Sequence, residues 1–136
     1  MKSLTKSSRE QAIQNALDNS GYRVGIFVAK NSSIVVEHIN VYMHSPESEI
    51  YSRSVKSEMN YIQFKNGSEI RIINASNVLR GRRFHEILAS QELDTEFVRN
   101  LLAPFEIPYF KDHICEYDLE CSFDISQDLS MLFSED

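Results

Sequence analysis

Three side chains in this 136-residue chain have the residue types of a metal site. His113, Cys115 and Cys121 lie close together in the sequence, and zinc takes imidazole and thiolate ligands, with an acid such as Asp118 as a possible fourth. On an extended strand the two cysteines would be roughly 20 Å apart, so the strand would have to bend. Two reduced, buried cysteines and a disulfide are the alternatives. We expect no cofactor, with a structural zinc as the alternative.

A second group could bind phosphate. Arg80, Arg82 and Arg83 form a compact basic loop, and guanidinium groups recognise phosphate, a nucleic-acid backbone or an acidic partner. The alternative is a solvated loop whose arginines pair with Glu86, Glu92 or acids nearer the C-terminus. The sequence leaves both interpretations open.

The acidic residues are concentrated at one end. Residues 111–136 carry a net charge of −7, whereas the whole chain carries −6, which leaves +1 for residues 1–110. Such a segment disfavours non-specific nucleic-acid binding and favours contact with a basic partner surface. The candidate partner-binding residues are four of its acids, Glu116, Asp118, Glu120 and Asp124.

The elements that must position these residues indicate one layered domain. With 42% hydrophobic and 25% charged residues, the chain has the composition of a folded domain. Helical and strand patterns are interspersed, which predicts an α/β or α+β fold with a mixed sheet, flanking helices and a central β-hairpin at 61–73. We expect residues 1–110 to form this domain and residues 111–136 to pack on it as an acidic C-terminal segment.

The first half of the chain predicts two helices and a strand. Ser7 and Glu10 have capping-box spacing, and Gly21 stands where the first helix would end. Its apolar stripe is Ala12, Ile13, Ala16 and Leu17. Residues 22–29 are nearly continuously apolar, as in a buried strand of the kind that parallel sheets contain. The caps available to a second helix are Asn31, Ser32 and Ser33, and its apolar residues are Ile34, Val35, Ile39, Val41 and Tyr42, although their β-branched content also permits a strand.

The second half begins with the hairpin. Residues 61–65 and 68–73 alternate apolar and polar positions, and Asn66-Gly67 between them is the residue pair typical of a type I′ turn. We also expect strands at 49–56 and 84–89, a helix over 93–102 and an apolar segment at 104–110. The edge at 49–56 is a possible homodimer seam. Of the histidines, His38 is predicted to be buried and His85 to form a hydrogen bond at a strand edge.

Two motifs carry a family resemblance. YIQFKNGSEIRI followed by LRGRRFHEIL resembles the middle of the ATPase domain of phage terminase large subunits, over roughly residues 22–103. That resemblance implies a phosphate-binding loop before the strand at 22–29 and an acidic metal-binding pair after the strand at 86–88. No GxxxxGK[ST] motif is present. Ser90 and Gln91 stand where the acids would be, so we do not expect ATP hydrolysis.

The sequence therefore predicts a non-enzymatic, phage-encoded accessory protein. It would bind, and inhibit, a basic nucleic-acid-handling protein of the host or phage through its acidic surface, as an anti-CRISPR type inhibitor does. The alternatives are a nucleic-acid-binding module that uses the Arg80–Arg83 loop and a degenerate terminase-like nucleotide binder. We expect the protein to act in the host-cell cytoplasm, without membrane contact.

Overall fold

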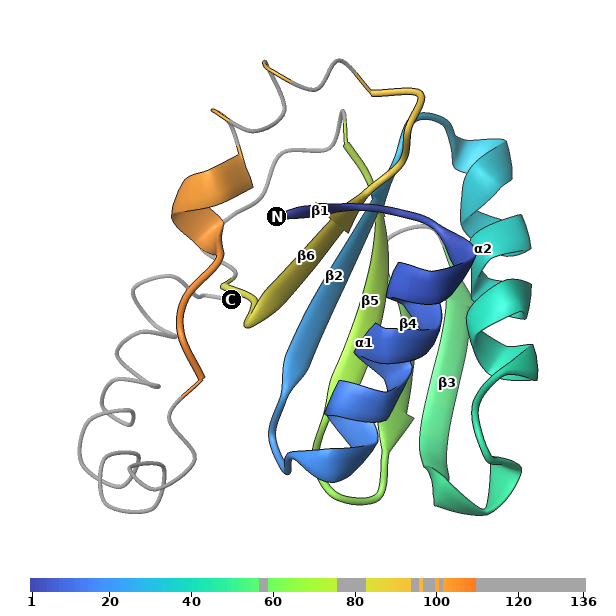
Figure 1. Cartoon of the computed structure of the whole chain (residues 1–136). Coiled ribbons are helices and arrows are strands. Elements are labelled where there is room, and N and C mark those ends of the chain that lie inside the picture. Colours follow the sequence, from blue (N-terminus) through green and yellow to red (C-terminus); the bar gives the residue numbers. More distant parts are fainter. Residues whose placement is uncertain (57–58, 76–82, 94–95, 97–99, 101, 110–136) are drawn as a thin grey trace.

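The computed structural model describes residues 1–56, 59–75, 83–93, 96, 100 and 102–109. The elements in chain order are β1 (Lys2–Ser3), α1 (Lys6–Asp18), β2 (Arg23–Val28), α2 (Asn31–Met43), η1 (Glu47–Glu49), β3 (Ile50–Lys56), β4 (Met59–Phe64), β5 (Glu69–Asn74), β6 (Glu86–Ala89) and η2 (Ala103–Phe105). The strands form one mixed sheet of order β1-β6-β2-β5-β4-β3 (Figure 1). The predicted mixed fold is confirmed, although the helix expected at 93–102 and the segment 111–136 fall mostly or wholly outside the described residues.

Four neighbouring strands make the parallel part of the sheet. β2 pairs in parallel with β5 on one side and β6 on the other, and Ile26 lies opposite both Ile72 and Leu88. Residues 24–28 are all buried, as expected for a parallel strand covered on both faces. β1 extends this parallel part by pairing with β6. A two-residue strand leaves no periodic pattern, so the sequence did not predict it.

Both helices cover the same face of the sheet (Figure 1), and the larger core lies beneath them. The predicted α1 stripe packs there, and the hairpin contributes the alternating side chains that its pattern assigned to one face. The buried members are Ala12, Ile13, Ala16, Val24, Ile26, Val28, Ile34, Val41, Ile62, Phe64, Ile70, Ile72 and Leu88. Within the described residues, neither helix has the length and apolar character needed to span a bilayer.

A smaller core lies on the opposite face. Phe27 and Phe84 pack edge to face with ring centroids 6.0 Å apart, and Ile87 and Leu102 join them. Residues 103–109 run beside Phe84, whose N–H donates to the carbonyl of Phe105 at 2.8 Å. The expected apolar segment at 104–110 is thus found against the core through residue 109.

The starts of both helices differ from the predictions. α1 is capped by Thr5, whose Oγ1 accepts from the Ser8 N–H while Ser8 Oγ accepts from the Thr5 N–H, so the Ser7–Glu10 capping box is wrong by two residues. α2 has Lys30 at its N-cap without a side-chain cap. Asn31 instead accepts from Asn74 Nδ2 at 2.8 Å, because the end of β5 lies next to the first turn of α2.

The hairpin turn also differs in type. Among the described residues no non-glycine residue has a positive φ, and Gly67 has a φ of 89°, which excludes the type I′ turn predicted for Asn66-Gly67. The Gly67 N–H donates to Phe64 O, and the Phe64 N–H donates to Ser68 O. These bonds describe a three-residue loop with a G1 bulge. The Asn66 side chain instead joins the hairpin to α1, because its Nδ2 donates to the carbonyl of Ala16 near the end of that helix.

Candidate functional site

Most of the predicted site residues fall outside the described part of the chain. These are the acids Glu116, Asp118, Glu120 and Asp124, the metal candidates His113, Cys115 and Cys121, and the arginines Arg80 and Arg82. Arg83 is described, and its guanidinium carbon lies 5.5 Å from the centroid of the Phe105 ring. Arg83 therefore helps to hold residues 103–105 against the sheet. No group of three His, Cys, Asp or Glu side chains suited to a metal ion occurs within the described residues.

The carboxyl edge of the parallel strands is where ligands bind in open α/β sheets. Ser90 and Gln91, the positions matched to the acidic pair, do lie there, directly after β6. The Ser90 N–H donates to Phe27 O at 2.9 Å, and Ser90 Oγ accepts from the Glu92 N–H at 3.3 Å. Ser90 thus closes a turn.

A polar cluster closes the opposite, amino edge. Glu86 is only 3% exposed, and its carboxylate accepts hydrogen bonds from Lys2 Nζ, Asn15 Nδ2 and Tyr22 Oη, each at 3.0 Å. Burial, together with the charge of Glu86, raises the pKa of Tyr22 above its ordinary value. The cluster ties β1, α1 and β2 to the start of β6.

His85 lies beside this cluster. Its Nδ1 accepts from the Arg23 N–H at 2.9 Å, which leaves the proton of the neutral ring on Nε2. The ring stacks on Tyr22 and meets Tyr109 edge to face. Burial, with the charge of Arg23 second, lowers the pKa of His85 to about 4. At neutral pH both Tyr22 and His85 are therefore uncharged, and neither pKa is near the value at which a general acid or base works best.

The lowered pKa of His85 predicts a pH-dependent stability. The unfolded chain binds a proton at this histidine below about pH 6.5, whereas the folded chain does so only near pH 4. The contribution is therefore fully present above pH 6.5 and is lost as the pH falls from there toward 4. After allowance for solvent screening it amounts to about 1–2 kcal/mol.

Urea unfolding from pH 7 to pH 4 measures this effect. His85→Asn keeps an acceptor near the Arg23 N–H but does not titrate, so the stability difference between wild type and variant should shrink as the pH falls. A ring-proton NMR titration should place the His85 midpoint near 4. A stability difference that stays constant, or a midpoint above 6, would contradict the assignment.

His38 is buried on the inner side of α2, as the sequence predicted. Its Nδ1–H donates to Asn60 Oδ1 at 2.8 Å, and its Nε2 accepts from Arg53 Nη1 at 3.2 Å, since arginine can only donate. Burial and the charge of Arg53 lower the pKa of His38. Arg53 also lies over the Tyr42 ring, 3.8 Å from its centroid. Both ring nitrogens are thus occupied, and His38 joins α2 to β3 and β4.

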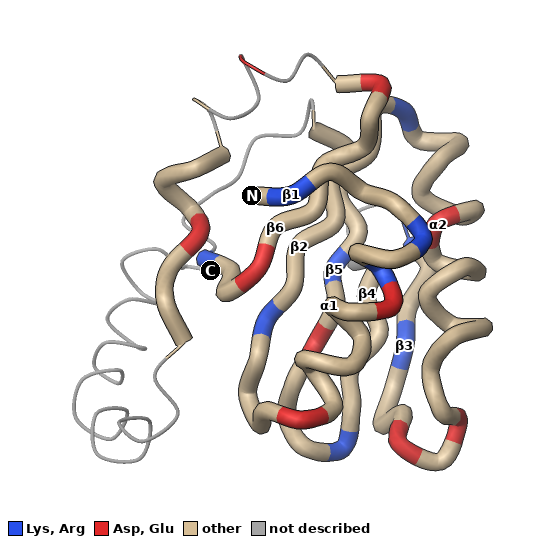
Figure 2. Tube along the Cα trace, viewed as in Figure 1, with Lys and Arg blue, Asp and Glu red and all other residues tan. Residues whose placement is uncertain are grey.

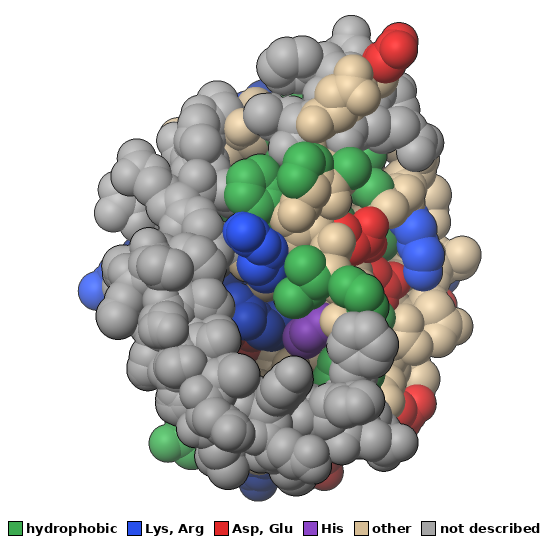
Figure 3. Space-filling model, turned by 90° about the vertical axis from the view of Figure 1, so that its left-hand side faces the viewer, with side chains coloured by type: hydrophobic (Ala, Val, Ile, Leu, Met, Phe, Trp, Pro, Cys, Tyr) green, Lys and Arg blue, Asp and Glu red, His purple; other side chains and the backbone are tan. Residues whose placement is uncertain are grey.

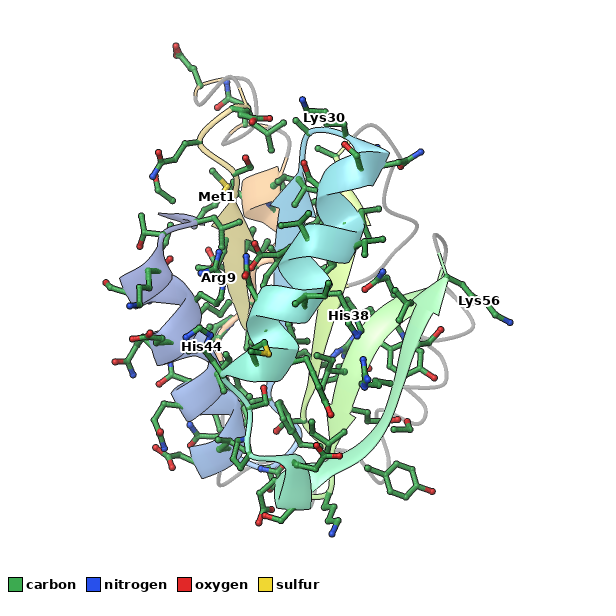
Figure 4. The ribbon with its side chains drawn as sticks, turned by 90° about the vertical axis from the view of Figure 1, so that its right-hand side faces the viewer. Met1, Arg9, Lys30, His38, His44 and Lys56 are labelled. Atoms are coloured by element: carbon green, nitrogen blue, oxygen red, sulfur yellow. The ribbon has the colours of Figure 1, made fainter. Side chains whose placement is uncertain are left out.

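The outward side of α2 is the feature that the sequence analysis missed. We call Ser32, Val35, Val36, Ile39 and Met43 the α2 outward face. Its four apolar side chains are 47%, 59%, 51% and 71% exposed in that order. The only Asp, Glu, Lys or Arg side chain within α2, Glu37, points inward to Arg9 and is 5% exposed. Figure 4 looks onto this helix, which lies between α1 and β3.

A helical projection of the sequence would have shown that α2 is apolar on more than one side, but not which side is buried. The apolar residues of α2 are too many for one stripe, and the structure divides them. Ile34 and Val41 face the sheet, whereas Val35 and Ile39, which the prediction placed with them, face outward. The exposed residues of α1 are polar in contrast: Lys6, Ser7, Glu10, Gln11, Gln14 and Asp18. An apolar face without charges on a surface helix marks an interaction surface.

The opposite side of the molecule differs from the α2 outward face in the side chains that it exposes. On the side of residues 103–109, Lys and Arg side chains gather next to a histidine (Figure 3). Arg71 is engaged within the fold, because it pairs with Glu69 at 3.1 Å and lies over Tyr61.

Comparison of the chain with protein-family models, with curated proteins and with solved structures found no match, so the resemblance to terminase large subunits stays a prediction.

Proposed function

We propose that this chain is a non-enzymatic accessory protein that docks its acidic C-terminal segment, residues 111–136, on a basic surface of a nucleic-acid-handling protein and so inhibits it. The observation that carries the proposal is the charge distribution, −7 in that segment against +1 in residues 1–110. A basic channel that binds phosphates also attracts clustered carboxylates. In keeping with the resemblance, we propose a phage-encoded protein.

The described part of the chain supports this choice because several of its acids are engaged within the fold. Glu37 pairs with Arg9, Glu69 with Arg71, and Glu86 with Lys2. Along the described chain, acidic and basic residues are interspersed (Figure 2). A partner that binds negative charge therefore finds its densest concentration in residues 111–136.

The experiment captures partners from phage-infected host lysate on the immobilised chain and then measures the affinity of the purified complex. We expect a basic nucleic-acid-handling protein whose activity falls on binding. A variant with Glu116→Gln, Asp118→Asn, Glu120→Gln and Asp124→Asn should bind about a hundredfold more weakly, because exposed charge contacts contribute about 0.5–1 kcal/mol each.

The matched control neutralises four exposed acids of the core and leaves binding nearly unchanged. Its substitutions are Glu10→Gln, Asp18→Asn, Glu92→Gln and Glu96→Gln, which change the net charge by the same amount. Equal loss from both variants would mean that net charge alone governs binding, and would contradict the proposal. So would salt-sensitive binding of duplex DNA that Arg82→Ala with Arg83→Ala abolishes, which is the result expected of a nucleic-acid-binding module.

A further inference from the structure

The α2 outward face has the spacing of a helix that packs against another helix. Ser32, Val36, Ile39 and Met43 are separated by four, three and four residues, which is the spacing of the a and d positions along a helix–helix seam. Val35 lies beside this seam and is 47% exposed. The inner side of the helix packs on the sheet, since Ile34, His38 and Val41 are buried, which turns the opposite side toward solvent.

This seam is also symmetric about its own centre, so that it can pair with a second copy of itself. A spacing of four, three and four reads the same in both directions, so two antiparallel copies of α2 match position for position. Ile39 of one copy meets Val36 of the other, and the large Met43 meets the small Ser32. We propose that a second copy of this chain covers the α2 outward face through a two-fold, antiparallel α2–α2 contact.

The charges around α2 favour the antiparallel arrangement over the parallel one. Lys30, just before α2, and Glu47, just after it, are both exposed. Antiparallel packing brings Lys30 of each copy to the end where Glu47 of the other lies, and it also aligns the helix dipoles favourably. Parallel packing would place Lys30 beside Lys30. No charge on the seam itself opposes the contact, since Glu37 is turned inward.

The other candidate seam is less suited to a second copy. β3 is one of the two edge strands, as the sequence predicted, but its pairing with β4 is interrupted by a bulge near Tyr51. It also carries Arg53 and the exposed Lys56. Bulges and edge lysines are devices that prevent strands from pairing across molecules. The apolar α2 outward face has neither a bulge nor a lysine.

The size of the contact sets its expected strength. A helix of 13 residues is about 20 Å long, and a contact between two such helices buries less than the roughly 800 Å² per partner of a standard interface. The dimer should therefore dissociate on dilution. It is tested independently of the proposed docking of residues 111–136, because the two proposals are probed by substitutions at different residues.

Sedimentation velocity over a dilution series of the full chain tests the proposal. Wild type should shift from dimer to monomer on dilution. Ile39→Lys should raise the dissociation constant about a hundredfold, because each copy would place a charge in an apolar contact. The matched control is Gln14→Lys on the exposed side of α1, which should leave the dimer unchanged. Circular dichroism of each variant checks that it is folded.

A charge-rescue experiment tests the orientation. Val36→Glu should also abolish the dimer by itself. An equimolar mixture of Val36→Glu with Ile39→Lys should form a heterodimer, since antiparallel packing places the introduced lysine of one copy beside the introduced glutamate of the other. A wild type that stays monomeric at its highest concentration would overturn the proposal. So would folded Ile39→Lys that dimerises like wild type, or a mixture of the two variants that stays monomeric.

Discussion

Replacing Arg9 with methionine is expected to lower the free energy of unfolding by about 3–5 kcal/mol, because it leaves the Glu37 carboxylate buried without its partner. Arg9 Nε and Nη2 donate to the two oxygens of Glu37 at 2.5 and 2.9 Å. The two side chains are only 13% and 7% exposed, so water cannot replace the lost bonds. Urea unfolding at neutral pH measures the loss.

A double variant separates the cost of an unpaired charge from the value of the pair. Arg9→Met with Glu37→Leu replaces the bidentate contact between α1 and α2 by an apolar one of similar size. Such replacements are often close to neutral, so the double variant should recover most of the stability lost by Arg9→Met. If the double variant were as unstable as the single one, the loss would have to come from packing of the Arg9 side chain, and our explanation would be wrong.

Phe84→Ala is expected to cost a similar amount, about 3–5 kcal/mol, because it leaves a cavity beneath residues 103–109. Phe84 is 0% exposed and packs edge to face on Phe27. The backbone of Phe84 also binds residues 103–109, since the Ile107 N–H donates to Phe84 O at 2.8 Å. Thermal or urea unfolding gives the value, and a loss below about 1 kcal/mol would show that the site collapses around the missing ring.

Gly25 provides the matching test of how closely this ring is packed. A Cβ at Gly25 would lie 3.0 Å from Cγ and Cδ2 of Phe84, so Gly25→Ala alone should cost about 1–3 kcal/mol by overpacking. In the Phe84→Ala background the same methyl group fills part of the cavity, and its cost should vanish or change sign. Equal costs in both backgrounds would mean that the clash is relieved elsewhere.

The sequence by itself determined the elements whose pattern is local. The hairpin strands alternate apolar and polar residues with period two. Their apolar residues Ile62, Phe64, Ile70 and Ile72 all lie in the core, as predicted. The nearly continuous apolar run at 22–29 predicted the buried β2. These predictions succeeded because each depends only on which side chains of one segment must leave water.

Local sequence was not sufficient where several residues compete for the same role. Thr5 caps α1 in place of Ser7 because Ser8 returns the hydrogen bond. Asn66 was expected to take a positive φ, but its side chain bonds to Ala16 O and, within this turn, Gly67 alone takes that conformation. Both outcomes depend on partners that the local pattern does not identify.

For the candidate sites, the sequence determined the charge distribution and hence the acidic segment. It did not reveal the α2 outward face, because Val35 and Ile39 are as apolar as the buried Ile34 and Val41. Only the packing of α2 against the sheet and α1, fixed by Arg9–Glu37 and by His38, decides which side of the helix turns inward. The physical reason is that hydrophobicity says which side chains gain from burial, whereas the buried polar contacts between distant segments select the one orientation that satisfies them.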